Sequence, residues 1–357
     1  MTVRPGGAGG RENRVHGAGD GAQTRWVDID QDAVAAAFGL GRPSGPWRAL
    51  DNGGAPTGAR VLETARGRWT VRTGRLRSEW HHRQAHRVQR LQRAALAAGI
   101  EMPRPVEPPR PAVGYWHRLA GDEVVQVGEW LDGHDLRRPG ADLVAATEWT
   151  GRTLARIAVL DTGGEQPPAP HPVEEWREWV AEAEAGGLPV AAPARALLPA
   201  VADAIALVRD AQRAAPAAVL VHGDTSRANV LRTPGGYALI DWESVQPEVP
   251  WWDAVSVAFR FATPFNGPTV SADPRTVRPL LAAYLDAGGP GGPAEESAFA
   301  GLLRSQLAST AWFLWLAMGH READAGQRAF GLRVVTDTAR ELPGVLRGLP
   351  DWTALLR

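Results

Sequence analysis

The segment 219–243 constrains the fold of this 357-residue chain more than any other. An apolar run leads into the turn His222-Gly223-Asp224, and Asn229 follows five positions after Asp224. A Pro-Gly-Gly turn then joins two further apolar runs, and the second of these ends at Asp241. We therefore expect a short hairpin that brings Asp224, Asn229 and Asp241 to one edge, an arrangement typical of a site rather than of a core.

The composition excludes several kinds of chemistry. The chain has no cysteine, so disulfides, thiolate metal sites and cysteine nucleophiles are excluded. It has no lysine either, because all 39 basic residues are arginine, and this excludes Schiff-base chemistry on lysine. A net charge of -1 gives no general attraction to nucleic acid or membranes. We find no membrane-crossing apolar run and no signal peptide, and we expect a cytoplasmic protein without a nucleic-acid or membrane partner.

The first half of the chain predicts a small antiparallel sheet with one long helix. Residues 1–25 are Gly-rich and polar, and we expect them to form a disordered tail. The glycine-rich segment 51–58 resembles an ordinary hairpin loop more than a flap over phosphates. Within a first lobe, 26–131, we expect a short helix at 33–38, strands at 47–50, 59–64, 68–72 and 124–131, and a helix at 77–98.

The second half predicts a larger, mainly helical lobe, 132–357. A Pro-rich link precedes it, and the pair Asp132-Gly133 marks the boundary between the lobes. Glycine and proline clusters separate its helical patterns. The predicted helices are 141–160, 173–184, 199–214, 254–261, 275–286, 296–318 and 322–342.

Four blocks of this sequence resemble the aminoglycoside phosphotransferase and choline kinase superfamily. They are His222-Gly223-Asp224, Asn229-Val230-Leu231, Ile240-Asp241-Trp242-Glu243 and Trp252-Asp253-Ala254-Val255. The resemblance implies an α+β, protein-kinase-like fold with two lobes. It also implies a small-molecule kinase that uses ATP, or another nucleoside triphosphate, with Mg²⁺, and that phosphorylates a hydroxyl of an aminoglycoside-like antibiotic, a sugar or an amino alcohol.

The same resemblance assigns roles to single residues. Asp224 would be the catalytic residue that accepts or orients the proton of the acceptor hydroxyl. Asn229 and Asp241 would supply hard oxygen ligands to Mg²⁺. His222 would brace the turn, and Asp253 would support the catalytic loop from behind.

Nucleotide binding by the first lobe is where the sequence departs from the family. Arg72 stands where the family has a strand lysine that holds phosphates, and the two side chains are not equivalent. Glu79 is the expected helix partner of this cation. Gln126 and Glu129 belong to the strand expected to face the adenine ring. Glu243 is either a further metal ligand or a glutamate paired with an arginine.

Other hypotheses remain open at this stage. Arg72 motivates the alternative of an inactive, nucleotide-binding pseudokinase that acts as an interaction module. A metal-dependent hydrolase built on His222, Asp224 and Asp241 fits less well, because Asn229 completes the kinase pattern. Side chains that would suit an acceptor pocket, but that more often belong to a solvated face or a core, are Glu174, Glu178, Glu182, Trp251, Trp252, Trp312 and Trp315. His82 and His86 are spaced for a metal on one helix face, but the arginines around them favour a solvated basic face.

Overall fold

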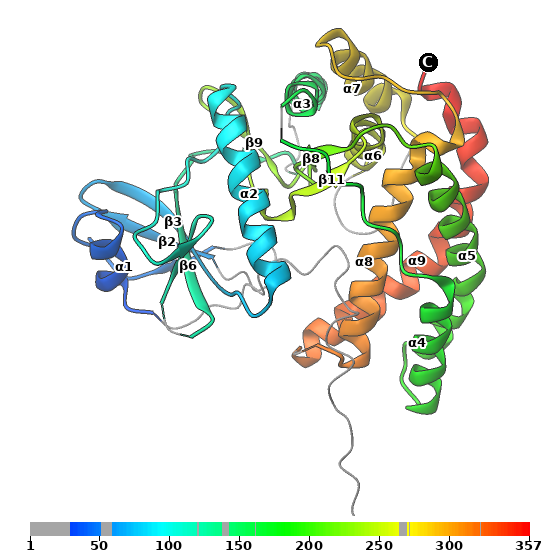
Figure 1. The fold of residues 1–357 in the computed structure, drawn as a ribbon, viewed down its shortest axis with the longest axis horizontal. Coiled ribbons are helices and arrows are strands. Elements are labelled where there is room, and N and C mark those ends of the chain that lie inside the picture. Colours follow the sequence, from blue (N-terminus) through cyan, green and yellow to red (C-terminus); the bar gives the residue numbers. More distant parts are fainter. Residues whose placement is uncertain are drawn as a thin grey trace, which may run out of the picture.

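The computed structural model describes residues 29–50, 59–119, 121–137, 143–160, 162–263, 270, 272–321 and 323–357. The predicted tail 1–25 and the glycine-rich segment 51–58 lie outside the described residues. Figure 1 shows a small part built around a sheet and a larger part built from helices, joined by the strands that carry the 219–243 segment. This is the α+β arrangement that the sequence predicts.

The sheet of the small part has six antiparallel strands in the order β1-β2-β3-β6-β5-β4. Its central pair aligns Arg72 with Gln126, so both residues lie at the same level of the sheet. The strands β4 and β5 were not predicted, because they are only two and three residues long and follow a Pro-rich stretch. The elements of this part are α1 (Gln31–Ala37), β1 (Arg48–Ala49), β2 (Ala59–Thr64), β3 (Gly67–Arg75), α2 (Glu79–Ala97), β4 (Ala112–Val113), β5 (Trp116–Arg118) and β6 (Glu123–Glu129).

Helix α2 is the long helix that the sequence predicts, and it stands between the sheet and the second part (Figure 1). Ser78 caps its N-terminus by accepting a hydrogen bond from the backbone N–H of His81. Its buried side chains recur at helical spacing, so one face packs inward while most of its arginines remain in solvent. Those buried residues are His81, Gln84, Ala85, Val88, Leu91, Gln92 and Ala95.

The helical part agrees with the predicted pattern, with two differences in helix length. Helix α5 begins eight residues earlier than expected and contains Pro199 in its interior. Helix α9 does not end at Pro343 but continues to Trp352, because packing against α5 and α8 offsets the missing backbone donor. The helices are α3 (Leu143–Ala158), α4 (Val173–Ala185), α5 (Ala191–Arg213), α6 (Pro250–Phe261), α7 (Pro274–Asp286), α8 (Ala300–Met318) and α9 (Ala325–Trp352), with short 3₁₀ turns at 296–299 and 353–355.

Among the described residues, one helix that the sequence prediction did not single out is long and apolar enough to cross a membrane by length and composition alone. This helix is α5, and it packs in the helical part against α4, α8 and α9. Its buried positions follow helical spacing, as in the core helix of a globular protein.

Short strands between α5 and α6 form the hairpin that the sequence predicts. Strands β9 (Val230–Thr233) and β10 (Gly236–Leu239) pair through the Pro-Gly turn, and β9 also pairs with β7 (His134–Asp135). Strand β8 (Val219–Val221) pairs with β11 (Gln246–Glu248). These two small sheets form the boundary between the two parts of the molecule.

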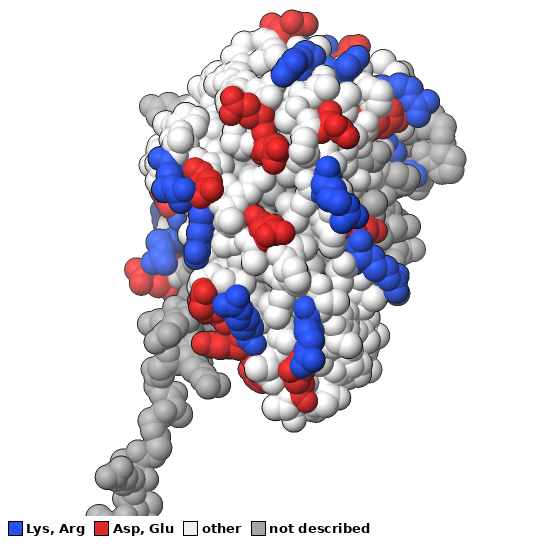
Figure 2. Space-filling view, turned by 90° about the vertical axis from the view of Figure 1, so that its right-hand side faces the viewer, with Lys and Arg blue, Asp and Glu red and all other residues white. Residues whose placement is uncertain are grey.

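The face of the helical part shown in Figure 2 carries charges of both signs in close alternation. Opposite charges one helical turn apart also form ion pairs in this part of the molecule, such as Arg340 with Asp337 at 3.3 Å. On this face we see no extended area of a single sign.

Candidate active site

Gly223 allows the turn after β8 to pass close to a second loop. Its backbone has φ +80°, and a Cβ atom at this position would lie 2.0 Å from the carbonyl oxygen of Ser244. Both observations require glycine, because other residues disfavour this φ and no side chain fits. The His-Gly-Asp turn is thus built by close contact with the segment that follows Asp241.

His222 joins the same two loops by hydrogen bonds. Its Nε2 lies 2.9 Å from the carbonyl oxygen of Ile240, and its Nδ1 accepts from the N–H of Asp224 at 3.3 Å. Burial lowers the pKa of His222 to about 4, so the ring is neutral, with its proton on Nε2. The edge of Trp242 packs against the ring. His222 therefore fixes the turn and does not line the cavity described below.

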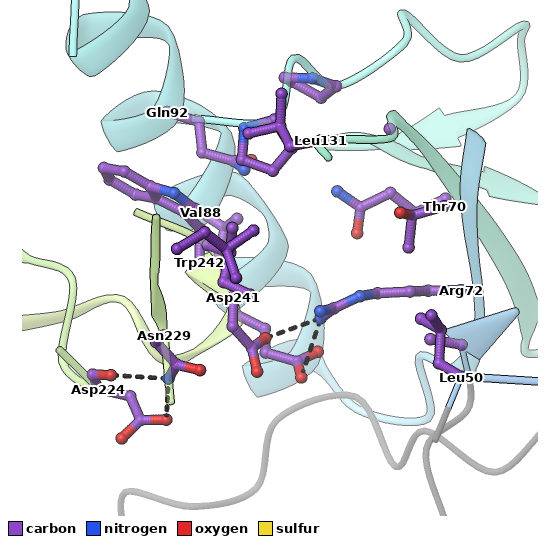
Figure 3. A pocket seen from close by; sticks show the side chains of 18 of the residues that line it. Leu50, Thr70, Arg72, Val88, Gln92, Leu131, Asp224, Asn229, Asp241 and Trp242 are labelled. Carbon is purple, nitrogen blue, oxygen red and sulfur yellow. Dashed lines mark hydrogen bonds and ion pairs between the residues drawn. The ribbon is translucent and has the colours of Figure 1, made fainter. Parts of the chain in front are cut away.

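Asp224 and Asn229 are held together by two hydrogen bonds. The Asn229 Nδ2 donates to the backbone oxygen and to Oδ2 of Asp224, both at 2.8 Å (Figure 3). This leaves Oδ1 of Asn229 as an acceptor. Burial raises the pKa of Asp224 to about 6, although the nearby charge of Arg260 lowers it. A carboxylate with such a pKa suits proton transfer near neutral pH.

Asp241 lies beside this pair in a strained backbone conformation. Its φ of 66° is the only positive value among the described residues other than glycine. The hydrogen bond from the N–H of Ile240 to the oxygen of Asn229, at 2.9 Å, places Asp241 beside Asn229. A 3₁₀ turn, Trp242–Ser244, begins at once after Asp241. Burial acts to raise the pKa of Asp241, but the charge and hydrogen bond of Arg72 outweigh it and the pKa is lowered.

Arg72 reaches from the sheet to two carboxylates of the other part. Its Nη1 lies 2.9 Å from Oδ1 of Asp241 and 3.0 Å from Oε1 of Glu243 (Figure 3). Of the two interpretations of Glu243, the structure contains the arginine-paired one. Burial raises the pKa of Glu243 more than Arg72 lowers it.

The structure does not place Glu79 next to Arg72, so the expected pairing of these two residues is wrong. It lies at the first turn of α2, its side chain is 87% exposed, and it pairs with Arg83 one turn later. Because Glu79 lies at the N-terminus of the helix, its carboxylate points into solvent, where its negative charge interacts favourably with the helix dipole.

A cavity of about 600 Å³ lies between the two parts, and it gathers most of the predicted site residues. Asp224, Asn229 and Asp241 line it from the helical part, and Arg72 from the sheet (Figure 3). Gln126 and Glu129 of β6 also line it. The sequence analysis did not predict that α2 would line the cavity. The sequence feature that could have indicated it is the four-residue spacing of Gln84, Val88 and Gln92, which puts them on one helix face.

At the end of the strand expected to face the base, two backbone N–H groups are already hydrogen-bonded within the protein. The N–H of Glu129 donates to the oxygen of Arg104 at 2.8 Å, and the N–H of Trp130 donates to the oxygen of Arg68 at 3.1 Å. Leu131 is the next residue that lines the cavity, and its N–H has no hydrogen bond to any described residue.

Asp253 lies outside the cavity lining, buried in the first turn of α6. Burial raises the pKa of its carboxyl to about 7. Among the described residues, no hydrogen bond joins the Asp253 carboxyl to the loop 222–229. Any support that Asp253 gives to this loop therefore acts through the packing of α6.

The residues considered for an acceptor pocket lie elsewhere. Trp251, Trp252 and Trp315 are buried in the core. Glu174, Glu178 and Glu182 are on the exposed face of α4, where Glu174 pairs with Arg177 and Glu182 with His320. None of these side chains lines the cavity.

The donor set at the cavity fits Mg²⁺ bound together with phosphates. Oδ1 of Asn229 and the carboxylate of Asp241 are hard oxygen ligands on neighbouring loops. Within the described part of the chain no group of three His, Asp or Glu side chains is arranged to hold a metal by itself. This suits Mg²⁺, which often takes one or two protein ligands and completes its shell with substrate oxygens and water.

Comparison with known proteins decides the family. The sequence pattern described as "Phosphotransferase enzyme family" matches residues 47–299, which include the whole cavity lining. The chain belongs to this family. Solved structures similar to this phosphotransferase confirm the protein-kinase-like fold. A search of curated proteins finds no match.

Three of the similar structures illustrate the likeness in fold, each with a TM-score above 0.5. An aminoglycoside phosphotransferase from Alicyclobacillus acidocaldarius has a TM-score of 0.55 at 16% identity, over 93% of this chain and 98% of the other. A spectinomycin phosphotransferase in complex with ADP and spectinomycin has a TM-score of 0.60 at 12% identity, over 89% of this chain and 99% of the other. A choline/ethanolamine kinase family protein from Mesorhizobium loti has a TM-score of 0.57 at 19% identity, over 90% of this chain and 96% of the other.

Proposed function

We propose that this phosphotransferase moves the γ-phosphoryl group of ATP to a hydroxyl of a small molecule, such as an aminoglycoside-like antibiotic, a sugar or an amino alcohol. The observation that carries the proposal is the convergence of Asp224, Asn229, Asp241 and Arg72 on one cavity. A carboxylate base, two hard oxygen ligands and a fixed cation are the groups that phosphoryl transfer requires.

Asp224 is the residue proposed to receive the acceptor proton. Its pKa of about 6 leaves most of the carboxylate ionised at neutral pH, yet basic enough to accept a proton. The hydrogen bond from Asn229 fixes Oδ2, so Oδ1 is the oxygen that can meet the acceptor hydroxyl.

Asn229 and Asp241 are proposed to hold Mg²⁺, which neutralises charge on the nucleotide phosphates when it is bound. Arg72 would bind phosphate oxygens with the N–H groups that its two carboxylate partners leave free. The nucleotide proposal draws support from the similar spectinomycin phosphotransferase, which is solved with ADP.

The base is proposed to bind at the end of β6. Leu131 is the candidate donor, because its N–H is the first one past the strand without a partner among the described residues. Thr70 of β3 and Leu231 of β9 line the cavity from the sheet and from the helical part, and we expect them to contact the ring.

Incubation with labelled ATP, Mg²⁺ and a panel of aminoglycosides, sugars and amino alcohols tests the proposal. We expect transfer to at least one acceptor class and a thermal shift with ATP. Thermal shift without transfer to any acceptor would favour the pseudokinase alternative. Absence of both would overturn the proposed function.

A further inference from the structure

The cavity-facing side of α2 carries no acidic residue. The helix presents His81, Gln84, Ala85, Val88 and Gln92 to the cavity, and all of these side chains lack a negative charge. Arg72 therefore finds no carboxylate on α2, and both of its ion-pair partners, Asp241 and Glu243, come from the segment after β10.

We propose that Glu243 is the positioning residue for Arg72, in the place that a helix glutamate was expected to take. The inference rests on the proposed function, because it assigns the residue that orients the phosphate-binding cation. Asp241 is proposed as a metal ligand and cannot serve Arg72 alone once the metal competes for its oxygens and phosphates compete for the guanidinium. Glu243 has no such second duty in the proposed chemistry.

The contacts of Glu243 fit this role. Its Oε1 accepts from Nη1 of Arg72 at 3.0 Å, and the Glu243 side chain is 32% exposed. A side-chain hydrogen bond also joins its carboxyl to that of Asp241, so Arg72 and the two acids form one cluster. Because Nη1 serves both carboxylates, Nε and Nη2 of Arg72 are left without a partner among the described residues and remain available to a phosphate.

Helix α2 acts on the same segment through an amide. Nε2 of the buried Gln84 donates to the backbone oxygens of Glu243 at 3.0 Å and of Val245 at 2.7 Å. These bonds hold the 3₁₀ turn against α2, so the position of the helix sets the position of the Glu243 carboxylate. Gln84 thus couples α2 to Arg72 through Glu243.

Calorimetric titration of ATP into the Glu243→Gln variant, with EDTA and separately with Mg²⁺, tests the inference. We expect binding about tenfold weaker than wild type under both conditions, the loss associated with one charge-assisted hydrogen bond. The exposed Glu79→Gln change is the matched control and should leave both affinities unaltered. A Glu243→Asp variant should bind ATP with intermediate affinity.

Two results would overturn the positioning role. Loss of affinity only with Mg²⁺ would make Glu243 a metal ligand, and tighter binding in EDTA would make it a competitor of phosphate for Arg72. In an Arg72→Ala background, Glu243→Gln should cause no further loss in EDTA, and additive losses would also contradict the proposal. Melting temperatures of all variants identify any loss caused by misfolding.

Failure of the inference can be told from failure of the proposed function. Wild-type protein that neither binds ATP nor transfers phosphate would overturn the function itself. Wild-type protein that does both, while Glu243→Gln binds ATP normally in EDTA and Mg²⁺, would overturn only the role of Glu243.

Discussion

Arg72 and Asp241 lie 169 positions apart in the sequence, and a hydrogen bond of 2.9 Å joins them across the cavity. The residue that departs most from the family pattern is therefore in direct contact with a proposed metal ligand.

The Arg72→Lys variant tests whether arginine is a working substitute. Lysine keeps the charge but loses the planar fork, in which Nη1 meets both carboxylates while Nε and Nη2 are left for the proposed phosphate contact. We expect ATP binding to weaken by about three- to tenfold, whereas Arg72→Ala should weaken it by a factor of about ten or more. Isothermal titration gives both values. Equal losses in the two variants would contradict a charge-based role.

The Asp224→Asn variant tests the proposed base. We expect kcat to fall by a factor of about 10² to 10⁴, because asparagine cannot accept the proton. ATP affinity should remain within about twofold of wild type, because Arg72 and Asp241 are untouched. Steady-state rates and nucleotide titration measure the two quantities. Retained turnover would remove Asp224 from this role.

The pH dependence of activity follows from the same carboxyl. Burial raises the pKa of Asp224 to about 6, and the base must be ionised to accept a proton. We expect kcat/KM to be level above this pKa and to fall about tenfold for each pH unit below it. A profile measured on the free enzyme that stays level to about pH 5 would exclude Asp224 as the titrating base.

Replacing Gly223 by alanine should destabilise the fold. The added Cβ would lie 2.0 Å from the oxygen of Ser244, at φ +80°. We expect a loss of about 3 kcal/mol in the free energy of unfolding, combining backbone strain with the clash. Gly235→Ala is the control, since its Cβ meets only an ordinary contact at 4.0 Å and should change stability by about 0.5 kcal/mol or less. Urea denaturation compares the two.

His222 should make stability depend on pH in a defined direction. Its pKa is lowered from 6.5 to about 4 by burial, so between these values the unfolded chain binds a proton that the folded chain does not. The stability due to neutral His222 is full above pH 6.5 and is lost as the pH falls toward 4. The loss in free energy of unfolding that His222→Gln causes, relative to wild type, should therefore be about 2 kcal/mol smaller at about pH 5 than at about pH 7.5. Equal costs in urea denaturation would contradict this.

Local sequence was enough to predict the hairpin and the helices, because their signals lie within a few residues. The Pro-Gly turn and the apolar runs around it predicted β9 and β10, and the structure confirms them. Short strands were not predictable in the same way: β5 is set by pairing with β6 and β4 by pairing with β5, and not by an alternating pattern of their own. The course of α9 past Pro343 was likewise decided by packing.

The sequence by itself determined which groups could perform the chemistry. Asp224, Asn229 and Asp241 are fixed by residue type and spacing within one local unit, and they are three of the four residues that the proposed chemistry uses at the cavity. Tertiary structure decided the partner of Arg72. Glu79 and Glu243 are both carboxylates, and only the rotation of α2 and the close approach of the two parts turn the first to solvent and the second to the guanidinium.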